Sequence, residues 1–105
     1  GEIILVRFPF SDLTSRKYRP ALVVAVAEFS DIIVCQITSS KYGKRNIVQI
    51  TKGDFLSGGL PVKSYIRPDK LFTLSNKLVV GNPGKLRSAK TKEVKKELAR
   101  ILELA

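Results

Sequence analysis

The chain has 105 residues, with 19 Lys and Arg against 9 Asp and Glu, no His and one Cys, which gives a formal charge of +10. This length predicts one domain over residues 1–105 with a single core. The composition excludes an internal disulfide, a His/Cys zinc site and a histidine general base. The longest strictly apolar stretch, Ala21 to Ala27, is too short for a membrane helix, which needs about 20 residues. No signal peptide is visible, so we expect a cytoplasmic protein.

The positive charge is spread over the whole chain. Residues 85–105 carry a net +4, and residues 1–84 carry the remaining +6. A field of this sign attracts polyanions such as nucleic acid or an acidic protein partner. Because both the body and the tail are basic, we favour a surface that follows a phosphate backbone over one that lies on a membrane.

Short runs rich in β-branched residues follow one another along the chain. Phe10 to Pro20 is predicted to be a loop long enough to act as a functional flap. A helical turn is expected around Asp54 to Leu56, Pro68 is expected to bend or interrupt a strand, and Asn82-Pro83-Gly84 is expected to end one. The strands are predicted at residues 3–6, 21–27, 32–37, 46–50, 64–67, 70–75 and 78–80, with 21–27 and 32–37 forming a hairpin.

The C-terminal segment has helical periodicity. Its apolar residues, Val94, Leu98, Ile101, Leu102 and Ala105, fall on one face of a helix that Ser88 or Thr91 would cap. The lysine-rich face is expected to be solvated. The pattern as a whole predicts a mainly β (α+β) fold, in which a small curved sheet or barrel packs against this helix.

The residue types that remain for chemistry suit phosphate esters. There is no Ser/His/Asp or Cys/His set and no Walker-type glycine loop. Arg, Lys, Ser, Thr and Tyr can stabilise the charge that develops on a phosphorus centre without a metal or cofactor. RNA also carries its own nucleophile, the 2′-hydroxyl. Phosphate chemistry is therefore the best match for this set of residues.

Three segments are candidates for this chemistry. Arg19 precedes Pro20 at the mouth of a predicted central strand, although from composition alone a surface ion pair with Asp12 or Asp69 is the commoner use for it. The hydroxyls of Thr38-Ser39-Ser40 close the neighbouring strand, where they would lie at the same end of the hairpin or bind their own backbone. Lys41-Tyr42-Gly43-Lys44-Arg45 mixes cations with an aromatic ring, as single-strand nucleic-acid surfaces do. Cys35 is expected to be a small buried apolar group.

Several segments in order resemble the MazF/PemK family of toxin endoribonucleases from type II toxin-antitoxin modules, with the PemK-like branch nearest. The resemblance covers nearly the whole chain. The segments that carry it are Gly1 to Leu13, Lys17-Tyr18-Arg19-Pro20-Ala21-Leu22-Val23-Val24, Cys35-Gln36-Ile37-Thr38-Ser39, Gly58-Gly59-Leu60, and Ser64-Tyr65-Ile66-Arg67-Pro68-Asp69-Lys70-Leu71-Phe72-Thr73-Leu74. The chain departs from many relatives in its first loop, which is more basic here and lacks their glycines.

The resemblance implies an SH3-like, plasmid-toxin β-barrel of about five to seven strands with a C-terminal α-helix, acting as a homodimer. It implies a metal-independent endoribonuclease that cuts single-stranded RNA to 2′,3′-cyclic phosphate and 5′-hydroxyl ends, controlled by an antitoxin with an acidic segment. The family's catalytic arginine and hydroxyl match Arg19 and Thr38. The expected RNA contacts are Arg16, Lys17, Tyr18, Ser39, Ser40, Lys41, Tyr42, Lys44 and Arg45. The alternative is a non-catalytic toxin of the same fold that inhibits DNA gyrase or only binds RNA.

Overall fold

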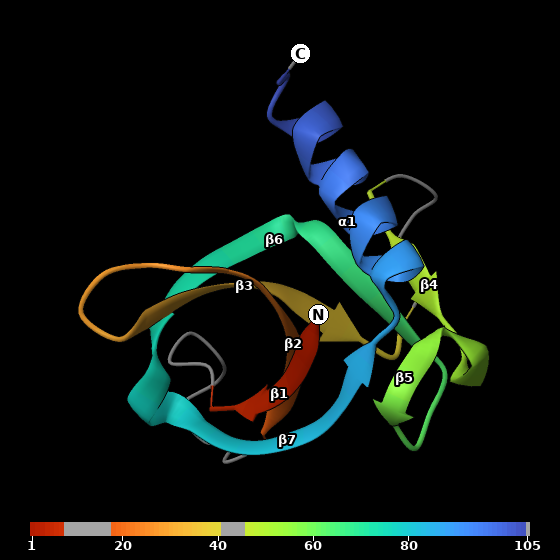
Figure 1. The fold of residues 1–105 in the computed structure, drawn as a ribbon, viewed down its shortest axis with the longest axis horizontal. Coiled ribbons are helices and arrows are strands. Elements are labelled where there is room, and N and C mark those ends of the chain that lie inside the picture. Colours follow the sequence, from red (N-terminus) through yellow and green to blue (C-terminus); the bar gives the residue numbers. More distant parts are fainter. Residues whose placement is uncertain (8–17, 41–45, 105) are drawn as a thin grey trace.

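The computed structural model describes residues 1–7, 18–40 and 46–104, in which the strands form one curled antiparallel sheet, open along one seam (Figure 1). The strand order is β4-β6-β3-β2-β1-β7-β5. This mainly β architecture with a C-terminal helix confirms the predicted fold class. The elements are β1 (Glu2–Val6), β2 (Arg19–Val26), β3 (Asp31–Thr38), β4 (Val48–Ile50), the 3-10 turn η1 (Lys52–Asp54), β5 (Phe55–Gly58), β6 (Ser64–Ser75), the 3-10 turn η2 (Asn76–Leu78), β7 (Val79–Leu86) and α1 (Ser88–Ile101).

The sheet has an apolar cluster on each face. Successive side chains of a strand point to opposite faces, so the continuous apolar runs of β1, β2 and β3 supply both clusters. One cluster holds Ile3, Leu22 and Cys35, and α1 covers it with Val94. The other holds Ile4, Ala21 and Val34. Every residue named here is buried, so the central strands are anchored from two sides.

The predicted hairpin is confirmed. β2 pairs with β3, and the turn between them places Phe29 and Ser30 at positive φ, 58° and 65°. Two consecutive residues of this kind give the left-handed turn that matches the twist of a hairpin. Arg19 and Pro20, predicted to close the preceding loop, instead begin β2, where Pro20 faces Leu5 of β1.

Of the two predicted breaks, one is a bend and the other is wrong. β6 is continuous through Pro68, which lies in a bulge where the β3–β6 register shifts between Cys35 and Gln36, so the strand is bent there and not interrupted. β7 runs through Asn82-Pro83-Gly84, because the β1–β7 register skips from Leu5↔Gly81 to Ile3↔Gly84. A bulge leaves a residue outside the ladder, so a proline there removes no needed hydrogen-bond donor.

Three further expectations need correction. The predicted helical turn around Asp54 to Leu56 lies slightly earlier, at η1, and Phe55 opens a strand, β5, that was not predicted. The strand predicted at residues 46–50 begins only at Val48. In α1 the N-cap is Arg87, without a side-chain cap, instead of Ser88 or Thr91. Val94 and Leu98 face the core as predicted, whereas Leu102 is 54% exposed. Ala105 lies outside the described residues.

Asp54 ties η1 to the start of α1. Its Oδ2 accepts hydrogen bonds from the Thr51 N–H at 2.7 Å and the Thr51 hydroxyl at 3.0 Å, and its carbonyl accepts one from the Arg87 N–H at 2.8 Å. Partial burial alone would raise the pKa of this carboxyl, but the Thr51 hydrogen bonds and the Lys90 ammonium outweigh it and lower the pKa. The carboxylate is therefore favoured in the folded chain.

Cys35 is fully buried and free, as expected. Burial, with a smaller contribution from the charge of Asp69, raises the pKa of its thiol to about 12. The thiol is therefore not ionised at neutral pH. No helix within the described part of the chain is long and apolar enough to cross a membrane.

Candidate active site

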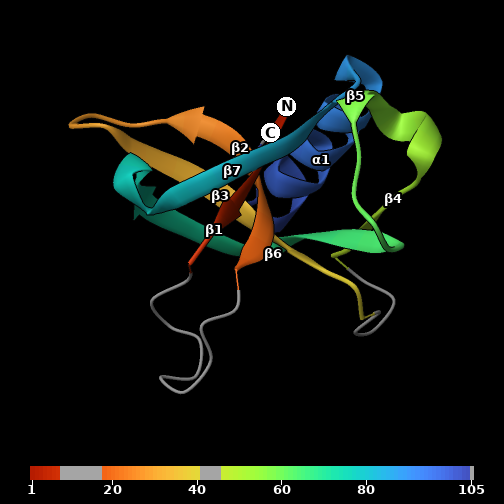
Figure 2. The ribbon, with the colours of Figure 1, turned by 90° about the horizontal axis from the view of Figure 1, so that it is seen from below.

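The β2–β3 register brings Arg19 and Thr38 together. The last paired residues toward this end are Ala21 and Gln36. Continuing this antiparallel register by two residues sets Arg19 opposite Thr38. Residues opposite each other share a face of the sheet, and both side chains lie on the face of the cluster that holds Ala21 and Val34. Figure 2 shows the start of β2 and the end of β3 on the same lower side of the molecule.

The strands on either side continue this line. Val6 of β1 faces Arg19, Tyr65 of β6 faces Thr38, and Gln49 of β4 faces Tyr65. Arg19, Thr38, Tyr65 and Gln49 therefore form a row across four strands, here called the polar row. Arg19 and Gln49 are exposed, and Thr38 and Tyr65 are half-buried. A strand of nucleic acid lying across this end of the sheet would meet all four side chains.

An arginine–aspartate pair flanks the polar row. Arg67 faces Gln36, two residues before Thr38 on β3, and so lies on the same face. It donates to Asp69 from Nε at 3.3 Å and from Nη2 at 2.9 Å. The Arg67 side chain is 21% exposed to solvent and the Asp69 side chain is 30% exposed. Asp69 therefore pairs with Arg67, and not with Arg19 as the alternative interpretation allowed. Asp12, the other partner considered, lies outside the described residues.

Arg19 is available for a ligand. Its side chain makes no hydrogen bond or ion pair with any other residue in ranges 1–7, 18–40 and 46–104. A guanidinium that is exposed and unpaired in this way can offer its planar fork of donors to a phosphate without first breaking an internal contact.

The Thr38 hydroxyl makes a local backbone contact. Its Oγ1 accepts a hydrogen bond from the Ser40 N–H at 3.1 Å. This is the self-capping role considered for the strand end, and it fixes the position of the oxygen. It leaves the hydroxyl proton free to be donated, since a hydroxyl both donates and accepts. Ser39 and Ser40 are exposed beside it.

Tyr18 is held next to Arg19 by Arg7. The Arg7 guanidinium carbon lies 5.5 Å from the centre of the Tyr18 ring, and its Nη2 donates to the Tyr18 hydroxyl at 3.2 Å. The ring is 48% exposed, so a base can still stack on it. The other predicted RNA contacts, Arg16, Lys17, Lys41, Tyr42, Lys44 and Arg45, lie outside the described residues.

The sequence alone predicts no role for Tyr65, Arg67, Gln36 or Gln49. The alternation of half-buried Tyr65 and Arg67 around buried Ile66 indicates that the two share a face. No signal in the sequence places that face beside Thr38, because the β3–β6 register includes a bulge. Within the described ranges, no group of three His, Cys, Asp or Glu residues could hold a metal ion.

Comparisons with known proteins identify the family of the sequence and structures that share its fold. A family model described as a PemK-like, MazF-like toxin of type II toxin-antitoxin systems matches residues 1–102. No curated protein matches the chain. Among solved structures, the Mycobacterium tuberculosis toxin MazF-mt6 is 16% identical with a TM-score of 0.79, covering 100% of this chain and 99% of that one.

Two complexes show the same fold. An endoribonuclease from a mycobacterial species, solved with its cognate antitoxin, is 19% identical with a TM-score of 0.77, covering 100% of this chain and 94% of that one. A MazE–MazF structure from Deinococcus radiodurans is 18% identical with a TM-score of 0.75 and the same coverages. At these identities the structures establish the fold, while the family model covers nearly the whole sequence.

Proposed function

The chain belongs to the PemK-like, MazF-like toxins of type II toxin-antitoxin systems, and from this premise we propose that it is an endoribonuclease that cuts single-stranded RNA without a metal ion. The observation that carries the proposal is that Arg19 and Thr38 lie at the same end of β2 and β3, each two residues beyond the last paired residues and on the same face, with Arg19 unpaired among the described residues. The absence of His from the sequence favours chemistry that relies on Arg, hydroxyl and carboxylate groups.

In this proposal Arg19 binds the scissile phosphate. The RNA 2′-oxygen attacks the adjacent phosphorus, and negative charge accumulates on the non-bridging oxygens. The guanidinium stabilises that charge through paired hydrogen bonds, and Thr38 donates its free proton to a phosphate oxygen. Arg19 stays protonated throughout, because a guanidinium does not lose its proton in proteins.

Asp69 is the proposed acceptor of the 2′-hydroxyl proton. Among the carboxylates on the described strands it lies nearest to Thr38 in the β3–β6 register, and Arg67 holds it in place. As the proton passes to Asp69, the new bond forms between the 2′-oxygen and phosphorus. The bond between phosphorus and the 5′-oxygen breaks, and that oxygen takes up a proton from water. The hydroxide left behind accepts the proton held by Asp69, which restores water and the carboxylate. The products are a 2′,3′-cyclic phosphate and a 5′-hydroxyl.

Aromatic rings flank the phosphate site on both sides. Tyr18 adjoins Arg19 in the chain, and Tyr65 faces Thr38 across the β3–β6 pair. Base stacking on such rings tolerates any sequence and is worth about 1–3 kcal/mol per base. We assign to them the positioning of the nucleotides beside the cut, together with the expected contacts of Ser39, Ser40 and the basic segments.

We further propose that the toxin is a homodimer controlled by a cognate antitoxin with an acidic segment. A chain of charge +10 attracts such a segment strongly. Two of the structures with the same fold contain an antitoxin, the mycobacterial complex and the MazE–MazF structure.

The test is incubation of the purified protein with a long unstructured RNA in EDTA, followed by mapping of cut sites and end groups. Arg19→Ala is expected to abolish cyclic-phosphate ends, whereas Lys77→Ala, which removes an exposed cation at η2, is expected to keep them. Intact RNA in every sample, with RNA binding or gyrase inhibition retained, contradicts the nuclease proposal and supports the non-catalytic alternative.

A further inference from the structure

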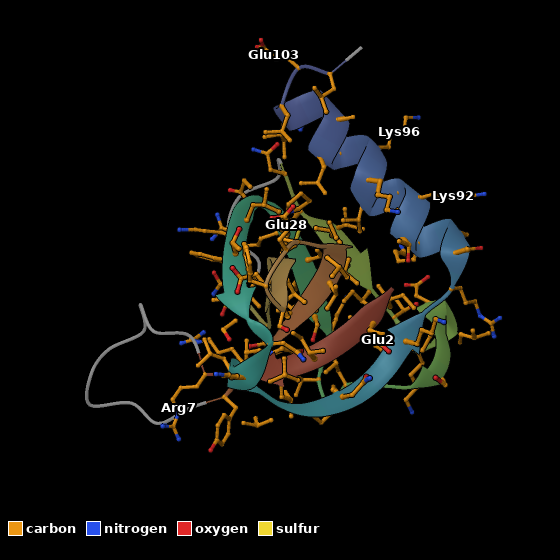
Figure 3. All side chains as sticks on the ribbon, turned by 60° about the vertical axis from the view of Figure 1, so that its left-hand side comes forward. Glu2, Arg7, Glu28, Lys92, Lys96 and Glu103 are labelled. Atoms are coloured by element: carbon orange, nitrogen blue, oxygen red, sulfur yellow. The ribbon has the colours of Figure 1, made fainter. Side chains whose placement is uncertain are left out.

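The cations of α1 fall into two sets. Lys90 lies 2.9 Å from Glu93 and 3.6 Å from Asp54, and Arg100 lies 2.9 Å from Glu97. By contrast, Lys92, Lys95 and Lys96 form no ion pair with any residue in the described ranges. These three are spaced so that they share one helix face, since residues three and four apart are neighbours. Figure 3 shows Lys92 and Lys96 projecting to the same side of α1, away from the sheet.

Two of the unpaired lysines, Lys92 and Lys95, border a hollow at the start of the helix. The hollow has a volume of about 490 Å³, and its lining includes Lys85 from β7, Arg87, Lys92 and Lys95. These four residues are here called the basic face. Arg87 is anchored because its Nε donates to the Gly53 carbonyl at 3.2 Å. Gly1, Leu56, Ser88 and Thr91 complete the lining with Leu86, so among the residues described no carboxylate and no aromatic ring borders it.

The basic face is separate from the polar row. β1 connects the two, because Gly1 borders the hollow while Val6, at the other end of the strand, faces Arg19. From Glu2 to Val6 the strand advances about 13 Å at its usual rise per residue. A single phosphate therefore cannot contact both places, whereas a longer polymer can.

We propose that the basic face is a second RNA-binding surface, which holds the phosphate backbone of the substrate away from the site of cleavage. This inference rests on the proposed function, because RNA is the substrate named there. Glu2 faces Lys85 across the β1–β7 pair, but no described carboxylate lines the hollow itself. The cations around the hollow repel one another, and a polyanion relieves that repulsion while releasing its own counterions. With no ring to stack on, the contact is to phosphates and does not depend on base sequence.

The experiment separates this surface from the active site by RNA length. The probe is 2′-O-methyl RNA, which lacks the attacking hydroxyl and stays intact, in strands of roughly 6 and roughly 30 nucleotides. The test variant carries Lys85→Gln, Lys92→Gln and Lys95→Gln. The matched control carries Lys52→Gln, Lys63→Gln and Lys77→Gln, which removes the same charge from exposed lysines elsewhere. Thermal unfolding verifies that both variants fold.

For the test variant we expect affinity for the long strand to fall about tenfold or more, and the slope of log K against log salt to become shallower by about 2, as for three lost phosphate contacts. Affinity for the short strand and cleavage of a short RNA are expected to stay unchanged. If the unsubstituted protein does not cleave RNA at all, the proposed function is refuted, but the measured affinity for the long 2′-O-methyl strand still tests the basic face.

Equal weakening by the test and control variants overturns the inference, because net charge alone then accounts for binding. Unchanged RNA binding with lost affinity for poly-glutamate also overturns it and assigns the basic face to an acidic protein segment.

Discussion

Arg67 donates a hydrogen bond to each carboxylate oxygen of Asp69, from Nε to Oδ1 at 3.3 Å and from Nη2 to Oδ2 at 2.9 Å. The two residues flank Pro68 in the β6 bulge, so the fold presents this carboxylate in a fixed orientation beside the β3 strand that carries Thr38. A positioned carboxylate is what a proton acceptor for the RNA 2′-hydroxyl requires.

Asp69→Asn keeps the shape of the side chain but removes its basicity. We expect the rate of RNA cleavage at saturating substrate to fall about 100-fold or more, with affinity for 2′-O-methyl RNA nearly unchanged. Asp31→Asn, the same change at the far end of the β2–β3 hairpin, is the control and is expected to cut at the parent rate. Parent-like cleavage by Asp69→Asn would show that another group takes the proton.

Thr38→Ser and Thr38→Val distinguish the hydroxyl from the methyl group. Serine retains both the acceptor for the Ser40 N–H and the free proton, so its cleavage rate should stay within about threefold of the parent. Valine keeps the volume but loses the donor, and we expect a loss of about 100-fold. A fluorogenic RNA measures the rates, and thermal unfolding checks that the valine variant is folded. Equal rates for the two variants would remove Thr38 from the mechanism.

Asp54 makes the stability of the fold depend on pH. Its pKa is lowered in the folded chain, so its contribution is complete above the ordinary carboxyl pKa of about 4 and disappears as the pH falls through the lower folded value. Asp54→Asn should cost about 1 kcal/mol of unfolding free energy at pH 7. Urea unfolding across acidic pH should show this difference shrinking toward zero. A difference that is independent of pH would contradict the assigned cause.

Gly58 is needed where β5 meets β7. It has a φ of +66°, and a Cβ there would lie 2.0 Å from the Pro83 carbonyl oxygen, whereas a Cβ on neighbouring Gly59 would meet nothing within 4 Å. Gly58→Ala is expected to cost about 2 kcal/mol or more in urea unfolding. Gly59→Ala, the matched control, should change stability by less than about 1 kcal/mol. Similar values for the two variants would show that the β5–β7 contact adjusts freely.

Local patterns predicted the first half of the described sheet well. The β2–β3 hairpin follows from two β-branched runs separated by a short turn, and the helix follows from the spacing of Val94, Leu98 and Ile101. The errors fall where Gly and Pro occur inside strands. Pro68 and Pro83 are ordinarily breakers, and only the pairing with a distant strand reveals the bulges that accommodate them.

In the candidate site, too, some residues could be predicted from nearby sequence and others could not. Arg19 and Thr38 lie at the same end of one hairpin, so their proximity follows from neighbouring segments. Tyr65 and Gln49 join them through the β3–β6 and β6–β4 pairings, which connect segments far apart in the chain. No rule of local spacing fixes such a register once a bulge intervenes.

The two apolar clusters share their strands, with Ile3 and Ile4, Ala21 and Leu22, and Val34 and Cys35 contributing to opposite faces. No central strand can leave one cluster without leaving the other. Unfolding should therefore be a single cooperative event. Within β2 and β3, the slowest-exchanging amides of residues from either cluster should exchange with solvent at one common rate. A protease that cuts within these central strands would then have to wait until the described sheet opens as a whole, so the rate of such cutting would be governed by that opening.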